Sequence, residues 1–189
     1  MLLRIRPKVR ARISAFGASV YPLEAFGLLL GTHGTDLEPA LVVAPLPVGK
    51  TRHWREPEGR FERVEEAVGI AREVFFPLGF QPVGVFCTHY DFSTASTWSD
   101  IEDAACRAGG LPWVLAQSVA GGERVWCPAV RHLVDGAWVD ATLEADRLPR
   151  TEPEYNPRRL LQRWTRAWEV MDYGNDHEVE LSGAGGVIQ

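Results

Sequence analysis

The sequence has few cysteines, no long apolar run and no excess of positive charge. Its 189 residues include three widely spaced cysteines, an odd number that does not suit a disulfide framework and favours a reducing compartment. The longest apolar runs, such as Phe26 to Leu30, are far shorter than the roughly 20 residues that a membrane-spanning helix needs. The formal net charge of −5 argues against nucleic acid as the main partner. A secreted disulfide scaffold, a membrane protein and a nucleic-acid-binding protein are therefore disfavoured.

The length and composition of the chain favour one domain with an extension. Hydrophobic residues make up 46% of the chain, which is ample for a buried core. The basic first residues, 1–12, lack the apolar region of a secretory signal peptide, so we expect a cytoplasmic protein. We expect a domain over residues 1–140, a linker over 141–156, and an amphipathic helix with a flexible tail over 157–189.

Hydrophobic periodicity predicts helices and strands in alternation. The clearest helix runs from Phe61 to Phe75, where apolar residues recur at helical spacing and Pro77 closes the pattern. Asp135-Gly136 predicts a hairpin turn, and residues 47–60 predict a surface loop. The other predicted elements are an edge strand or arm with a short amphipathic helix (2–20), strands (26–30, 41–44, 83–89, 111–118, 123–126, 130–134, 137–139) and a helix (99–108). This order predicts an α/β fold with helices packed against a sheet.

Residues 84–103 bring together a thiol, an imidazole and several carboxylates. In a strand, Val83, Val85, Cys87 and His89 share one face because side chains alternate along the chain. Cys87 and His89 then point the same way and lie close enough together to bind one metal ion.

A third metal donor is Asp100, in the first turn of the helix expected after the polar loop. Thr97 or Ser99 caps this helix, and the carboxylate of Asp100 can face back toward the strand. Sulfur, nitrogen and oxygen donors from three positions, with the fourth left to water, are typical of catalytic zinc. Asp91 and Asp103 are nearby alternative carboxylates.

This stretch resembles the signature of the JAMM metalloproteases, also called the JAB or MPN+ domain. The signature is His-x-His, seven residues, Ser, two residues, Asp, and the spacing here is the same. Cys87 stands in place of the first histidine and Thr97 in place of the serine. Residues 21–31, which contain Glu24, resemble the family's upstream motif Tyr-Pro-x-Glu-x-x-Gly-x-Leu-x-Gly. The resemblance covers roughly residues 10–140.

The resemblance implies a curved mixed β-sheet flanked by helices, JAB/MPN-like with cytidine-deaminase-like layering, and a zinc-dependent isopeptidase or peptidase. Cys87, His89 and Asp100 are then the Zn²⁺ ligands. Glu24 is implied as the general base and acid, and Thr97 as the hydroxyl that donates to the developing oxyanion. The implied substrate is the C-terminus of a ubiquitin-like or sulfur-carrier-like β-grasp protein.

Cys87 weakens this prediction and leaves an alternative open. A thiolate makes the zinc site more electron-rich than a histidine does, so its water is acidified less and we expect slower turnover. Alone, Cys87 is more often a buried apolar residue, and Asp100 more often a first-turn helix charge. The alternative is a catalytically weak or inactive scaffold or binding module.

A cysteine protease that pairs Cys87 with His89 is disfavoured, because the backbones of two residues side by side on a strand are roughly 6.5 to 7 Å apart, and the two side chains do not readily reach hydrogen-bond geometry.

The C-terminal region carries an apolar stripe of helical spacing, formed by Leu160, Leu161, Trp164, Trp168 and Met171. Such a stripe either completes the core of the domain or offers Trp164 and Trp168 as a docking surface for a substrate or partner.

Overall fold

The computed structural model describes residues 2–20, 24–32, 40–51, 58–89, 110–118, 129–145, 156 and 158–168. Its elements are β1 (Leu2–Ile5), α1 (Pro7–Val20), β2 (Glu24–Thr32), β3 (Ala40–Thr51), α2 (Glu58–Phe75), the 3-10 turn η1 (Phe76–Leu78), β4 (Gln81–His89), β5 (Trp113–Ser118), β6 (Ala129–Val134) and β7 (Ala137–Ala145). Residues 158–168 are also helical. The elements predicted at 99–108 and 123–126 lie outside the described residues.

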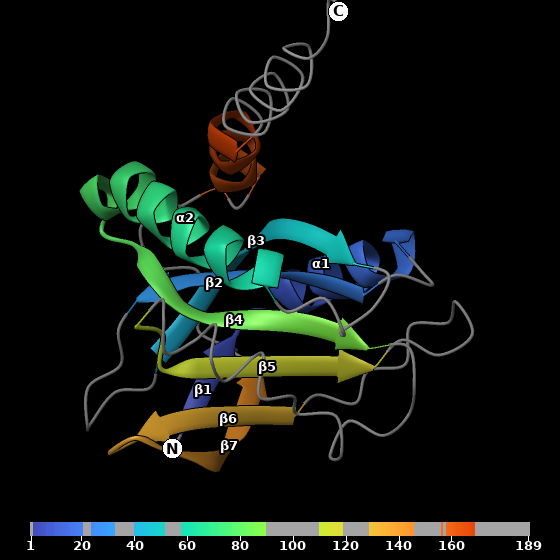
Figure 1. The fold of residues 1–189 in the computed structure, drawn as a ribbon, viewed down its shortest axis with the longest axis vertical. Helices are drawn as coiled ribbons and strands as arrows, with labels where there is room; N and C mark the ends of the chain where they lie inside the picture. The colour runs from blue at the N-terminus through green and yellow to red at the C-terminus, as the bar shows by residue number, and fades with distance from the viewer. Residues whose placement is uncertain are drawn as a thin grey trace, which may run out of the picture.

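The strands close into a barrel in the order β1-β3-β2-β4-β5-β6-β7 (Figure 1). The closure is made by β1, which pairs in parallel with β3 on one side and with β7 on the other. The predicted fold, a curved mixed sheet flanked by helices in JAB/MPN-like layering, is therefore wrong. That prediction treats the first residues as an edge strand or arm. Instead, β1 pairs with both β3 and β7, which are the two ends of the row formed by the other strands, and so it closes the sheet on itself.

One hydrophobic cluster fills the interior of the barrel. Every strand contributes to it, and α1 adds Val9 and Ile13. The buried strand residues are Leu3, Ile5, Leu29, Ala40, Val42, Val83, Phe86, Trp113, Leu115 and Val130, with Ala141 and Leu143 of β7 partly buried beside them. Burial of apolar side chains from all sides of a closed sheet holds the barrel together.

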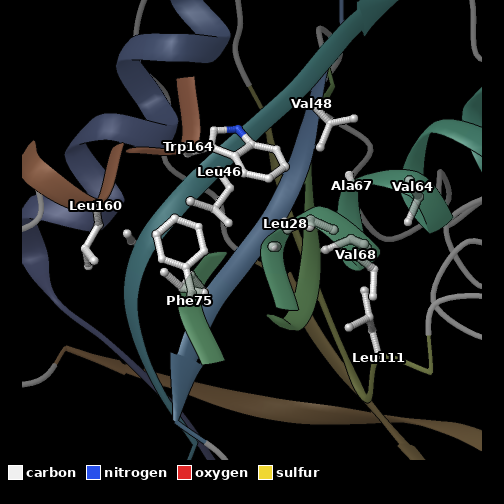
Figure 2. Packing of buried hydrophobic residues seen from close by; sticks show 14 of the residues in the cluster. Leu28, Leu46, Val48, Val64, Ala67, Val68, Phe75, Leu111, Leu160 and Trp164 are labelled. Atoms are coloured by element: carbon white, nitrogen blue, oxygen red, sulfur yellow. The ribbon is translucent and has the colours of Figure 1, made fainter. Parts of the chain in front are cut away.

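A second cluster lies on the outer face of β2, β3 and β4, where α2 covers the sheet (Figure 1). The predicted helix of residues 61–75 is confirmed, although α2 begins earlier, at Glu58. It buries one stripe spaced three and four residues apart, formed by Val64, Ala67, Val68, Ala71 and Phe75. These side chains meet Leu28 and Leu46 of the sheet (Figure 2).

Strand β3 extends through Pro45 and Pro47 to Thr51, beyond the predicted strand of residues 41–44 and into the predicted loop. Along β3, β1 pairs only with Ala40–Val42, so from residue 43 onward β2 is its one strand neighbour among the described residues. Two residues apart, Pro45 and Pro47 direct their backbone nitrogens to the same edge of the strand. Proline removes a donor at that edge without interrupting the pairing with β2.

The predicted Asp135-Gly136 hairpin is confirmed between β6 and β7. Both turn residues have positive φ, 49° at Asp135 and 82° at Gly136, as a two-residue type I′ turn requires. Strand β7 then runs to Ala145, into the range predicted as a linker. The division of the chain into domains stays a prediction.

The helical residues 158–168 join the outer cluster beside α2 through Leu160 and Trp164, both buried (Figure 2). This burial supports the interpretation that the apolar stripe completes the core. Trp168 is only partly buried, and docking of a partner on this helix stays a prediction. Within the described ranges, no helix is long and apolar enough to span a membrane.

Candidate functional site

The candidate site is organised around the end of β4, where β2 lies alongside in antiparallel pairing. Cys87 of β4 is the partner of Phe26 in this pairing. Glu24 begins β2 and His89 ends β4, and each lies two residues beyond that pair. The two sequence motifs therefore meet at the same end of neighbouring strands, although they are separated by about sixty residues of chain.

The junction between these strand ends is held by Thr88. The backbone N–H of Ala25 donates to Thr88 Oγ1 at 2.9 Å, in a buried hydrogen bond that joins the residue after Glu24 to the residue before His89. Thr88 is 2% exposed. A buried amide that keeps its acceptor avoids a desolvation cost, so this bond stabilises the relative position of the two strand ends.

Helix α1 packs on the other side of Thr88. A Cβ placed on Gly17 would lie 2.8 Å from Thr88 Cγ2, closer than side chains tolerate. Only a residue without a Cβ allows α1 to approach β4 this closely. Thr88 is thus packed between the backbone of β2 and the backbone of α1.

Cys87 lies in β4 two residues after Val85, which belongs to the outer cluster under α2. Cys87 is 5% exposed, and its Sγ donates a weak hydrogen bond to the carbonyl oxygen of Leu115 at 3.8 Å. A thiol can ligate zinc only after it loses its proton. Metal ligation by Cys87 stays a prediction, and it would exchange the Leu115 contact for a bond to the metal.

The prediction that Val83 shares the face of Val85 and Cys87 is wrong. The pairing of β2 with β4 shifts between Leu29 and Leu30, whose partners are Gly84 and Pro82, so Val83 is an extra residue at a bulge. Val83 accordingly packs in the barrel interior, whereas Val85 packs outside. The bulge reverses the alternation of side chains along β4.

The remaining predicted site residues are described only in part. The side chains of Glu24 and His89, and the whole of Thr97 and Asp100, lie outside the described residues, as do the alternative carboxylates Asp91 and Asp103. Among the side chains that are described, no group of three or more His, Cys, Asp or Glu could hold a metal ion. The complete ligand set stays a prediction.

Sequence reasoning missed Thr88 and Gly17. Thr88 occupies the variable position of the Cys-x-His motif, and nothing in the local pattern marks its hydroxyl as the acceptor for a residue 63 positions away. Gly17 lies within a helical pattern that any helix former would continue. Both roles depend on the way α1, β2 and β4 pack together.

No family model matches the chain, and no curated protein matches it. Among solved structures, a protein from Salinibacter ruber is 23% identical, with a TM-score of 0.53, and the match covers 81% of this chain and 95% of that one. A protein from Desulfitobacterium hafniense is 17% identical with a TM-score of 0.46, covering 77% and 94% of the two chains. A JAB1/MPN domain protein from Archaeoglobus fulgidus is 13% identical with a TM-score of 0.44, covering 75% and 97%. The first likeness shows a shared fold, and membership of the JAMM family stays a prediction.

Proposed function

We propose that the protein is a zinc-dependent isopeptidase or peptidase that acts at the C-terminus of a ubiquitin-like or sulfur-carrier-like protein. The proposal draws its chemistry from the spacing of Cys87, His89, Thr97 and Asp100. The observation that carries it is the pairing of Phe26 with Cys87, supported by the Ala25–Thr88 hydrogen bond. Together they bring the strand end of the predicted general base beside the strand end of the predicted ligands.

Each residue of the proposed site has a separate task. Cys87, His89 and Asp100 would hold zinc, which supplies a water of lowered pKa and polarises the scissile carbonyl. Glu24 accepts the proton of the attacking water and returns it to the leaving amine. The hydroxyl of Thr97 donates to the oxygen that becomes negative as the bond breaks. Thr88 contributes indirectly, because its bond to Ala25 fixes the backbone next to Glu24.

A catalytically weak or inactive scaffold is the second candidate. The observation that favours it is the environment of Cys87, whose buried thiol donates to the Leu115 carbonyl as an ordinary structural cysteine does. In this case the protein keeps the barrel and offers its surface to a partner without hydrolysing a bond.

Zinc content separates the two candidates. Wild-type protein, Cys87→Ala and Cys127→Ala are purified without added metal, and zinc is measured by mass spectrometry. The proposal predicts about one zinc per chain in wild type and in Cys127→Ala, because Cys127 is not part of the signature, and a loss in Cys87→Ala. Folded, metal-free wild type would favour the scaffold.

Turnover then tests the contribution of the thiolate. Cys87→His restores the more common ligand, so at equal zinc occupancy it should hydrolyse a C-terminally extended ubiquitin-like protein faster than wild type does. A collapse of activity in this variant would show that the thiolate is required.

A further inference from the structure

The outer edge of β3 beyond Val42 is covered by the helical residues 158–168. Trp164 is 1% exposed, and its indole Nε1–H donates to the carbonyl oxygen of Pro47 at 2.6 Å. Proline has no backbone N–H, so the carbonyl oxygen of Pro47 is its one backbone group that can form a hydrogen bond at this outer edge of β3. The indole thus satisfies an edge carbonyl that pairing with β2 does not use.

The indole is held in place from several sides. It belongs to the same cluster as Leu28, Leu46 and Phe75 (Figure 2). Trp168 stacks on it, with ring centroids 5.3 Å apart and ring planes inclined by 16°. A ring fixed by packing on one face and by stacking on another directs its N–H group to one position.

Pro47, which accepts the bond from Trp164, pairs with Gly27 at a point where the β2 and β3 backbones lie very close together. Pro47 pairs with Gly27 and Gly49 with Phe26, so Val48 is the extra residue of a bulge. A Cβ on Gly27 would lie 2.3 Å from the carbonyl oxygen of Leu46, so the two backbones approach each other here more closely than any side chain at this position would allow. A bulge changes the direction of the strand that follows, and the strand that follows leads to the Glu24–Thr51 pair.

The Trp164–Pro47 bond lies a short distance from the candidate site. Gly27 is three residues from Glu24, or about 10 Å along an extended strand. On the other side of β2, Phe26 pairs with Cys87. Strand β2 is thus paired with β4 on one side and with β3 on the other, and β3 is bonded to the C-terminal helix at Pro47.

We infer that Trp164 is a positioning residue of the candidate site: by bonding Pro47 it holds the bulged β2–β3 hairpin in place and sets the position of Glu24 relative to the end of β4. The inference rests on the proposed function for its catalytic consequence. It makes the C-terminal helix part of the site framework, although the helix begins 58 residues after Asp100, the last residue of the zinc signature.

The test uses Trp164→Phe, which keeps an aromatic ring in the cluster and removes the N–H group. Hydrogen exchange measured by mass spectrometry reports on the hairpin, and Val130→Ala in the barrel interior serves as a control for general destabilisation. We expect exchange in residues 24–28 and 46–51 to accelerate about ten-fold, as loss of one buried hydrogen bond predicts. The segments of β5, β6 and β7 should change little. In Val130→Ala, we expect exchange to rise across the barrel without this local excess.

Zinc content and hydrolysis complete the test. With a ubiquitin-like protein carrying a C-terminal peptide extension as the probe, Trp164→Phe should keep its zinc and its KM and lose turnover per zinc-loaded molecule. Hairpin exchange equal to that of wild type, or equal in pattern to that of Val130→Ala, overturns the inference. Active, zinc-loaded wild type with an equally active Trp164→Phe overturns the positioning role alone. Metal-free wild type overturns the proposed function and this role together.

Discussion

Replacement of Thr88 by valine is the most direct test of how the two strand ends are joined. Valine has nearly the volume and shape of threonine, so the packing against Gly17 is retained while the acceptor for the Ala25 N–H is lost. The amide stays buried without a partner, which costs about 1–3 kcal/mol of stability. For a chain of this length each kcal/mol lowers Tm by about 2–4 °C. We therefore expect Tm to fall by about 2–12 °C.

The control for this substitution is Thr88→Ser, which keeps the hydroxyl and removes the methyl group. Its cost is that of one buried methyl group, about 1 kcal/mol. Urea unfolding of the three proteins with equal m-values gives the free energies to be compared. If Thr88→Val is as stable as wild type, the hydrogen bond contributes no net stability and the strand ends are held by packing alone.

Three further predictions concern the surrounding framework. Gly17→Ala should lower the free energy of unfolding in urea by about 1–3 kcal/mol, because the new Cβ meets Thr88 Cγ2. The loss of stability should be smaller when Thr88 is replaced by serine, which lacks Cγ2, and equal losses with threonine and with serine would contradict this contact. Gly69 lies on an exposed turn of α2 with nothing within 4 Å of an added Cβ, so Gly69→Ala should raise the free energy of unfolding by about 0.5–1 kcal/mol. Gly136 has a φ of 82°, so Gly136→Ala should lower the free energy of unfolding by about 1–2 kcal/mol. A less stable Gly69→Ala or a more stable Gly136→Ala would refute the helical and turn geometries. Burial lowers the pKa of His132 from 6.5, so the unfolded chain takes up a proton more readily than the folded one. The free energy of unfolding should therefore fall as the pH drops below about 6.5. His132→Gln should flatten this pH dependence, and an unchanged pH profile would show that His132 is not its source.

The sequence predicted those elements whose signals lie within a few residues of one another. The apolar stripe of α2 recurs every three or four residues, and Pro77 follows its end. Asp135-Gly136 is a turn signal that works through the backbone freedom of two adjacent residues. The alternation around Cys87 is likewise local, and it correctly predicted a strand ending at His89.

The errors occurred where a distant partner decides the outcome. The composition of residues 47–60 indicates a loop, yet residues 47–51 belong to β3. Pro47 can continue the strand because β1 pairs only with the first residues of β3, so no strand needs a donor at the edge where Pro47 lacks one. Val83 changes face because β2 shifts register beside it, which no pattern within β4 records. Four residues at the start of the chain close the barrel only because β3 and β7 are both placed to pair with them.

By itself, then, the sequence determined the local elements and the candidate residues: a strand that carries Cys87 and His89, an upstream strand that follows Glu24, and a helix that buries one stripe. Only the tertiary structure decided the closure of the sheet and the contacts that fix the site. The Thr88 bond joins residues 63 positions apart, and the Trp164 bond joins residues 117 positions apart. The physical reason is that periodicity and turn chemistry act along the chain, whereas pairing, bulges and edge coverage depend on which strands and helices become neighbours in space.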